Sequence, residues 1–365
     1  MAAFAGYRQR RPPYRGRPAA RLFTRLDTGR HRGAHTMPAL SCAAPSAALR
    51  AQVLRWLARP VPDGADAAEL AQAVVAAVAA PLARHGVARL ALVERPELYP
   101  LERIEQLLLL VSRQIGFVLP QSYSEGELAH VQDQRRDYAL PGTRGHQTNN
   151  ALAFHSDRCD LNLLLYVRTS SNGGQLSVVP YAQAVEQVRA QAPAMLPDLF
   201  DGFPLDLREE RIFPSLLWHW RPILWERDGV VYGHYIRRFI ADSQRHADCP
   251  RLSTRQLQAL DRWDAVLDDL RQAHSFAPAP GELLLLDNYR VMHARSAYVD
   301  APAHDAQRLA LRTWVAPFDS PPLPLALHPL AGSCTAGSFR GGVGQGSSYL
   351  NRLGSTGHVH STEST

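Results

Sequence analysis

Several apolar runs of strand length, separated by turn residues, limit this chain to a fold with a β core. Leu161–Val167 and Leu283–Leu286 have the length and composition of buried strands. Leu176–Val179 follows the paired glycines Gly173 and Gly174, which are typical of a turn. The middle of the chain is therefore predicted to be rich in strands.

Helical patterns flank and interrupt these strands. Apolar residues recur at helical spacing through residues 46–115. Ser253 and Gln256 have the spacing of a capping box, which predicts a helix continuing to about Ala273. We expect a helical insert over about 181–275.

The two ends of the chain differ from the middle in composition. Residues 1–45 lack periodic apolar positions and predict a disordered, arginine-rich tail, which could also be a transit peptide or an extension upstream of Met37. Residues 331–365 are rich in glycine and serine and predict a flexible tail. The residues between them, 46–330, are predicted to form a single domain.

The net charge of +6 originates in the N-terminal tail. Residues 1–36 hold nine arginines and one acid, a balance of +8, which leaves −2 for the rest. A nearly neutral body argues against a nucleic-acid surface. No apolar run reaches the roughly 18–20 residues that span a bilayer, and the four cysteines form no CxxC pair. We expect a cytoplasmic protein without a membrane or nucleic-acid partner.

Two short motifs carry candidate metal ligands. His155 and Asp157 are two residues apart, so an extended segment would present both to one side. His293 follows the predicted strand Leu283–Leu286, 136 positions after Asp157 (293 − 157). A sheet would have to close between them for all three to share one ion.

A third motif places arginines on one face of a strand. In residues 308–314, alternation puts Arg308 and Arg312 on one face and Leu309 and Leu311 on the other. Guanidinium groups that face a core need anionic partners, and arginine binds carboxylates with two parallel hydrogen bonds. The alternative is a set of surface ion pairs.

Together these motifs resemble the TauD/TfdA-type family of 2-oxoglutarate dioxygenases. The resemblance covers about residues 95–318 and is carried by four stretches: FHSD (154–157), GGQLSVV (173–179), DNYRVMHAR (287–295) and RLALRTW (308–314). It implies an α+β, mainly β fold, a double-stranded β-helix (a jelly-roll, cupin-like barrel) flanked by helices.

The resemblance also implies a site and an activity. His155, Asp157 and His293 match the iron ligands, and Arg308 matches the residue that holds the 5-carboxylate of 2-oxoglutarate. Arg312 matches a position that meets an acidic substrate group or supports the co-substrate pocket. The implied cofactors are Fe(II), 2-oxoglutarate and O2, with release of succinate and CO2 and hydroxylation of a small, carboxylate-bearing substrate as the default outcome.

One position departs from the family pattern. Many members have Thr or Ser shortly after the paired glycines, where this chain has Leu176, with Ser177 one residue further on. A shift of one residue reverses the face of a strand. Asn150 and Arg295 are additional candidates for substrate binding, although Asn150 could instead cap a turn and Arg295 could pair with an acid such as Asp287.

Two other functions stay open at this point. The same three ligands could hold zinc in a hydrolase, which would leave Arg308 and Arg312 unexplained. A non-enzymatic barrel could bind RNA or an acidic partner through its arginine-rich tail. The primary substrate, the oxidative outcome and a homo-oligomeric state are not determined by the sequence.

Overall fold

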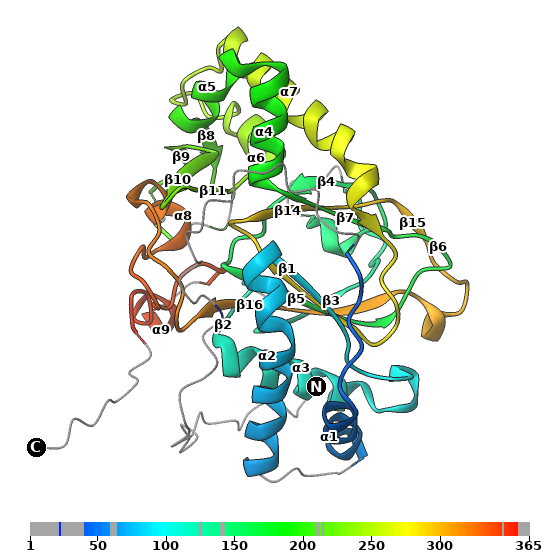
Figure 1. The fold of residues 1–365 in the computed structure, drawn as a ribbon. Coiled ribbons are helices and arrows are strands. Elements are labelled where there is room, and N and C mark those ends of the chain that lie inside the picture. The colour runs from blue at the N-terminus through cyan, green and yellow to red at the C-terminus, as the bar shows by residue number, and fades with distance from the viewer. Residues whose placement is uncertain are drawn as a thin grey trace, which may run out of the picture.

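Two antiparallel sheets lie at the centre of the molecule, with helices on their outer sides (Figure 1). The structure is a computed structural model that describes residues 22, 40–58, 64–123, 126–138, 143–208, 210, 212–213, 215–344 and 347–356. The chain is thus a mixed helical and antiparallel β protein.

The larger sheet has six strands among the described residues, and all its pairings are antiparallel. Its order is β1 (Val87–Ala91), β13 (Glu282–Asp287), β5 (Leu161–Arg168), β16 (Leu309–Pro317) and β2 (Gly116–Leu119), and β3 (Leu128–Val131) also pairs with β16. The strands predicted near residues 161, 283 and 308 are therefore present as three adjacent strands.

The smaller sheet carries the other predicted motifs. Its order is β12 (Ser275–Phe276), β7 (Leu176–Pro180), β14 (Val291–Arg295) and β4 (Leu152–His155). The strand predicted after the paired glycines is β7. A small ladder of β6 (Asn172–Gly173) and β15 (Tyr298–Val299) lies beside it.

Side chains from both sheets share a buried cluster. Leu164 and Tyr166 of β5 pack there with Val178 of β7. Leu163 and Leu165, the alternate residues of β5, join a second cluster on the helical side of the larger sheet. The strand is apolar on both faces because both faces are covered.

Three N-terminal helices cover the outer face of the larger sheet: α1 (Ala47–Ala58), α2 (Gly64–His85) and α3 (Leu101–Ile115). Among the described residues, only α2 is long and apolar enough to cross a membrane, a test that core helices of soluble proteins also pass. Leu70, Val74 and Val78 of α2 are buried with the sheet residues. Packing in the core accounts for its apolar composition.

The insert covers the outer face of the smaller sheet (Figure 1). It comprises α4 (Tyr181–Gln191), α5 (Leu196–Asp201), α6 (Arg237–Ser243), α7 (Thr254–Arg271) and two hairpins, β8 (Phe203–Asp206) with β9 (Trp218–Arg221) and β10 (Leu224–Arg227) with β11 (Val230–Gly233). The predicted capping box is confirmed, because Ser253 Oγ accepts from the Gln256 N–H at 3.2 Å and Gln256 Oε1 accepts from the Ser253 N–H at 3.0 Å.

The described part of the predicted C-terminal tail is packed, so the prediction of flexibility is wrong there. It contains α8 (His328–Ala331) and α9 (Ser347–Leu350). Arg340 is fully buried and pairs with the buried carboxylate of Asp160. Gly341 has a φ of 77°, and a Cβ there would lie 2.9 Å from the Arg158 carbonyl oxygen. The glycines serve close packing in this segment.

The described residues of the predicted N-terminal tail also take part in the fold. Leu22 is buried in the helical cluster, and Ala43 forms a bridge with Leu90 of β1. The prediction of disorder is wrong for these residues. Residues 1–21 and 23–39 lie outside the described residues.

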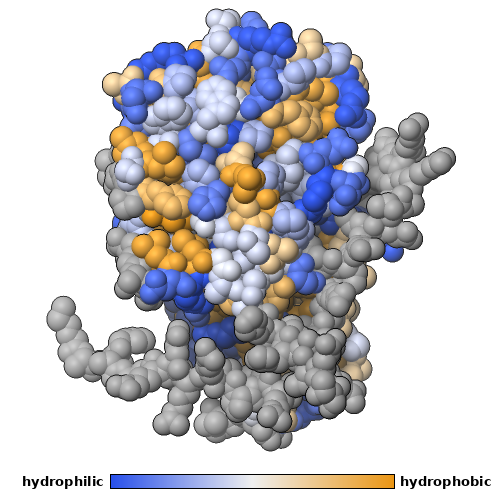
Figure 2. Space-filling view, turned by 90° about the vertical axis from the view of Figure 1, so that its left-hand side faces the viewer, coloured by the Kyte–Doolittle hydropathy of each residue, from blue (hydrophilic) through white to orange (hydrophobic). Residues whose placement is uncertain are grey.

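One face of the molecule carries exposed hydrophobic side chains. Figure 2 shows patches of hydrophobic residues separated by hydrophilic ones on the side of β9 and α8. Leu325 is 82% exposed, Trp220 45% and Leu217 40%. None of these three residues lines the pocket described next.

Candidate active site

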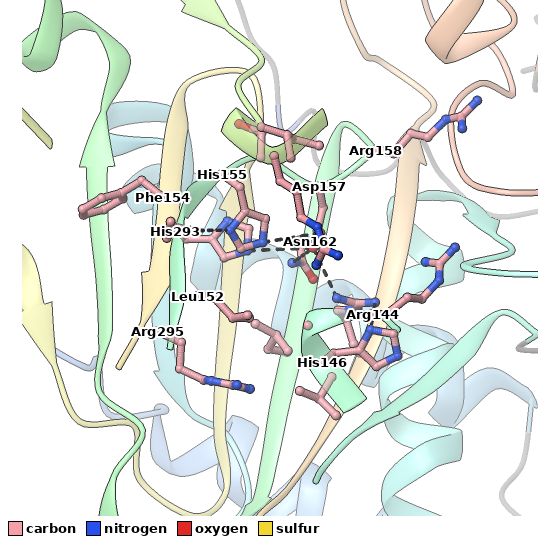
Figure 3. A pocket seen from close by; sticks show the side chains of 18 of the residues that line it. Arg144, His146, Leu152, Phe154, His155, Asp157, Arg158, Asn162, His293 and Arg295 are labelled. Carbon is pink, nitrogen blue, oxygen red and sulfur yellow. Dashed lines mark hydrogen bonds and ion pairs between the residues drawn. The ribbon is translucent and has the colours of Figure 1, made fainter. Parts of the chain in front are cut away.

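The three predicted metal ligands meet at one end of the space between the sheets. His155 ends β4, Asp157 follows it by two residues, and His293 of β14 lies directly opposite His155 in the pairing of β14 with β4. Nε2 of each histidine is 3.9 Å from a carboxylate oxygen of Asp157. The side chains point toward one another in Figure 3, and their candidate ligand atoms lie within 4.8 Å of one another.

Both imidazoles can offer Nε2 to an ion. The Nδ1–H of His155 donates to the Ala153 carbonyl at 2.8 Å, which leaves the Nε2 lone pair free. Burial and the neighbouring His155 lower the pKa of the His293 imidazole to about 3. His293 is therefore neutral near pH 7, as a metal ligand must be.

The Asp157 carboxylate is fixed by three donors on one oxygen. Oδ2 accepts from Asn162 Nδ2 at 2.6 Å, from Trp314 Nε1 at 3.2 Å and from Arg312 Nη1 at 3.5 Å. The Asp157 backbone N–H donates to Asn288 Oδ1 at 3.1 Å. The oxygen with fewer contacts, Oδ1, is the one nearer His155.

Charge keeps Asp157 ionised despite its burial. Burial alone would raise the pKa of this carboxyl, but Arg312, His293, His155 and the Trp314 indole together hold it well below its usual range. An ionised carboxylate beside two imidazoles is a donor set that fits a divalent metal ion such as Fe(II).

Arg312 lies at the same end of the pocket. Its Nε donates to Gln121 Oε1 at 2.7 Å, and its Nη2 lies 3.4 Å from His146 Nδ1. The family resemblance implies that Arg312 meets an acidic substrate group or supports the co-substrate pocket, and this stays a prediction; within the structure, Arg312 Nη1 lies 3.5 Å from Asp157 Oδ2. Arg312 thus supports a candidate metal ligand.

A single pocket joins the triad to two other arginines. Its volume is about 200 Å³. Arg308 and Arg295 line it, together with Val131, Leu164, Tyr166 and Leu176. Arg308 and Arg295 are each 3% exposed. The alternation predicted for residues 308–312 is confirmed, because Arg308 and Arg312 line the pocket while Leu309 and Leu311 pack toward the helices.

The structure separates the remaining candidates. Leu176 lines the pocket, whereas the Ser177 hydroxyl lies 2.7 Å from that of Ser275 on the neighbouring strand β12. Asn150 is exposed and does not line the pocket, although its carbonyl accepts from Arg295 at 2.6 Å. Arg295 is expected from the sequence either to face the pocket or to pair with an acid such as Asp287. It lines the pocket, and its Nη2 donates to backbone carbonyls.

Sequence reasoning missed the residues that orient Asp157. Asn162 and Trp314 are neighbours in the pairing of β5 with β16. The alternation that put Arg308 and Arg312 on the inner face also puts Trp314 there, so this signal was present. No motif or periodic pattern near Asn162 or Gln121 indicated that either residue belongs to the site.

Two imidazoles and one carboxylate beside buried guanidinium groups are the arrangement typical of non-haem iron oxygenases. The model of the "Taurine catabolism dioxygenase TauD, TfdA family" matches residues 55–314. The chain belongs to this family of dioxygenases, and its described residues include two histidines and one carboxylate that could hold a metal ion. The hypotheses of a zinc hydrolase and of a non-enzymatic barrel give way to this assignment.

Known proteins resemble the chain to different extents. FR-33289 synthase of Streptomyces rubellomurinus (strain ATCC 31215) is 28% identical over 178 residues, which cover 47% of this chain and 51% of that protein. The match thus spans about half the length of this curated relative.

Two solved structures share the fold. One is the non-heme iron oxygenase OrfP in complex with Fe and alpha-ketoglutaric acid, with a TM-score of 0.57, 15% identity and coverage of 76% of this chain and 94% of that one. The other is an asparagine oxygenase in complex with Fe(II), hydroxyasparagine and succinate, with a TM-score of 0.53, 15% identity and coverage of 73% and 89%.

Proposed function

We propose that this enzyme hydroxylates a small anionic organic substrate, with His155, Asp157 and His293 holding Fe(II) and Arg308 holding the distal carboxylate of 2-oxoglutarate. The observation that carries the proposal is the convergence of two imidazoles and one carboxylate on a pocket that also contains buried, pocket-facing guanidinium groups. In this proposal the two sheets form the double-stranded β-helix that the family resemblance implies.

His155, Asp157 and His293 would hold Fe(II), which together with 2-oxoglutarate would supply the redox chemistry for O2 activation, with succinate and CO2 as the co-products. The protein holds the ligands in place and limits the access of water. Asn162, Trp314 and Arg312 fix the Asp157 carboxylate before the metal binds, so little reorganisation is needed.

The charge of the pocket supports an anionic substrate. Eight arginines line it against two acids, Asp157 and Glu210. Because the chain has no lysine, this argument rests on the excess of positive charge and not on the choice of arginine. Some of these arginines are paired, such as Arg144 with Glu210. An excess of positive charge nevertheless remains, which favours an anion.

Arg158 is the candidate for contact with the substrate anion. It follows Asp157 directly and lines the pocket. Its Nε and Nη1 donate to the carbonyls of Leu330 and Glu210, while its buried Nη2 has no hydrogen-bond partner within the described part of the chain. A carboxylate or another oxyanion of the substrate would satisfy it.

A substrate screen scored by succinate release tests this function. Each anionic compound is paired with its neutral amide or ester, and a His155→Ala variant measures the background. We expect release that depends on Fe(II), 2-oxoglutarate and the anionic member of a pair. Equal turnover of neutral partners would contradict the substrate class, and full turnover by His155→Ala would contradict the ligand assignment.

A further inference from the structure

Two buried arginines in the pocket have no carboxylate partner among the described residues. Arg295 Nη2 donates to the carbonyls of Thr148 and Asn150 at 2.7 and 2.6 Å, while its buried Nε and Nη1 have no partner. Arg308 Nη1 donates to the Val131 carbonyl at 3.3 Å. Backbone carbonyls are neutral, so both guanidinium charges stay uncompensated, which is costly in a buried site.

The two guanidinium groups gather around the same aromatic side chain. The Cζ atoms of Arg295 and Arg308 lie 4.8 and 5.1 Å from the centroid of the Tyr298 ring. Burial and the nearby Arg308 lower the pKa of Arg295 to about 10. Two like charges this close favour an anion bound between or beside them.

Two tyrosines beside these arginines also have hydroxyls that are open among the described residues: Tyr166 lines the pocket, and the Tyr298 ring faces both guanidinium groups. The buried hydroxyls of Tyr166 and Tyr298 have no hydrogen-bond partner in the part of the chain that the structure describes. The Arg308 Cζ lies 5.6 Å from the Tyr166 ring centroid, so the groups belong to one cluster. A bound carboxylate would accept from several of them at once.

The strand register explains why Arg295 lies among the polar groups of this pocket. Leu176 of β7 is directly opposite Arg295 of β14 in the antiparallel pairing, and both line the pocket. Leu176 offers no hydrogen bond at the position where the family pattern leads one to expect a hydroxyl. Arg295 is the polar side chain beside it.

We propose that Arg295 and Arg308 together hold the distal carboxylate of 2-oxoglutarate, with Arg295 taking the place of a hydroxyl at residue 176. This proposal rests on the proposed function, which assigns Arg308 to that carboxylate. It replaces the earlier hypothesis that Arg295 binds the primary substrate. The selectivity for a dicarboxylic 2-oxo acid then depends on both arginines.

The test measures the binding of two 2-oxo acids to Mn(II)-loaded protein by calorimetry, without turnover. 2-Oxovalerate has a methyl group where 2-oxoglutarate has its distal carboxylate. We expect Arg295→Gln to weaken 2-oxoglutarate binding about 10- to 100-fold, the usual range for a hydrogen bond to a charged group. The same variant should bind 2-oxovalerate and Mn(II) as the wild type does.

A second variant tests the replacement directly. Adding Leu176→Thr to Arg295→Gln places a hydroxyl on the same face of β7 and should recover at least part of the lost affinity for 2-oxoglutarate. Leu176→Val in the same background is the matched control, because valine has nearly the shape of threonine without its hydroxyl. Equal effects of Thr and Val would overturn the replacement.

Arg295 could instead act only as a structural residue, by holding the carbonyls of Thr148 and Asn150 ahead of β4. In that case Arg295→Gln would weaken the binding of both acids or of Mn(II), and the proposal would be overturned. It would also be overturned if only the KM of the primary substrate rose.

Arg308→Gln covers the case in which Arg295→Gln fails to fold. If two arginines hold the carboxylate, this variant keeps a residual preference for 2-oxoglutarate over 2-oxovalerate, and complete loss of the preference contradicts the proposal. Failure of the wild-type protein to bind 2-oxoglutarate with Mn(II) would instead reject the proposed function itself.

Discussion

The two ends of the pocket differ in how their polar groups are satisfied. At the metal end, the His155 Nδ1–H and three hydrogen-bonding positions around the Asp157 carboxylate are satisfied by the protein, while the buried His293 Nδ1 has no partner among the described residues. At the other end, Arg295 keeps two buried nitrogens without partners among the described residues, and the hydroxyl of Tyr166, which also lines the pocket, is open as well.

This difference indicates what each end binds. A metal ion needs ligands whose orientation is set in advance, so the protein provides the outer hydrogen bonds itself. An anionic co-substrate brings its own acceptors, so the protein leaves strong donors open for it. Changes at the metal end should therefore alter metal affinity, and changes at the guanidinium end should alter only the affinity for 2-oxoglutarate.

The largest effect is expected for Asp157→Ala. This change removes a candidate ligand and the negative charge that faces His155, His293 and Arg312. We expect loss of Fe(II)-dependent succinate formation, and a loss of metal affinity greater than the roughly 10- to 100-fold cost of outer-shell changes. Titration with Mn(II) measures the affinity.

Asp198→Ala is the matched control for Asp157→Ala, because it removes a carboxylate that pairs with Arg255 on the surface. It should bind Mn(II) normally. If Asp157→Ala also bound Mn(II) normally, the triad would not be the metal site and the contrast between the two ends would be lost.

Arg308→Gln should give the next largest effect, confined to the other end of the pocket. Removing this guanidinium leaves a carboxylate without its main partner, and we expect 2-oxoglutarate affinity to fall about 100-fold. Mn(II) affinity should not change. A parallel loss of Mn(II) affinity would show that the two ends are not independent.

The sequence predicted the parts of this site that depend on local alternation. His155 and Asp157 are two residues apart, and Arg308 and Arg312 are four apart on one strand, so their shared faces follow from the geometry of extended chain. His293 came from the family resemblance and the order of motifs, since periodicity cannot join residues 136 positions apart. The pairing of β14 with β4 supplies that link.

The rest depends on packing that the sequence does not display. Asn162 reaches Asp157 across the bend at residues 158–160, and Gln121, which follows β2, reaches Arg312 only after β2 is paired with β16. The glycine-rich composition after residue 331 predicted flexibility. The structure instead uses Gly341 for close backbone contact and buries Arg340 against Asp160. Composition alone cannot separate these two uses of glycine.

A smaller effect on Mn(II) affinity is expected for Trp314→Phe, which tests one hydrogen bond to the candidate metal ligand Asp157. The variant keeps an aromatic ring but removes the indole N–H that donates to Asp157 Oδ2 at 3.2 Å. Loss of one outer-shell donor should weaken Mn(II) binding about 10-fold. Trp225→Phe, in the core cluster under the insert, is the control and should leave Mn(II) binding unchanged. Equal effects of both changes would point to general loss of packing.

The smallest effect is expected for Ser177→Ala, and it tests the strand register on which the contrast depends. The Ser177 hydroxyl lies 2.7 Å from the hydroxyl of Ser275, while the neighbouring Leu176 lines the pocket. Removing this hydroxyl should lower the free energy of unfolding by about 1 kcal/mol at most. The Kd for 2-oxoglutarate should stay within about twofold of the wild-type value, because a residue on the opposite face of β7 does not reach the pocket. A tenfold rise in that Kd would mean that β7 is shifted by one residue. Ser177 would then contact the distal carboxylate of 2-oxoglutarate together with Arg308. The unpartnered nitrogens of Arg295 would no longer be explained by binding of that carboxylate.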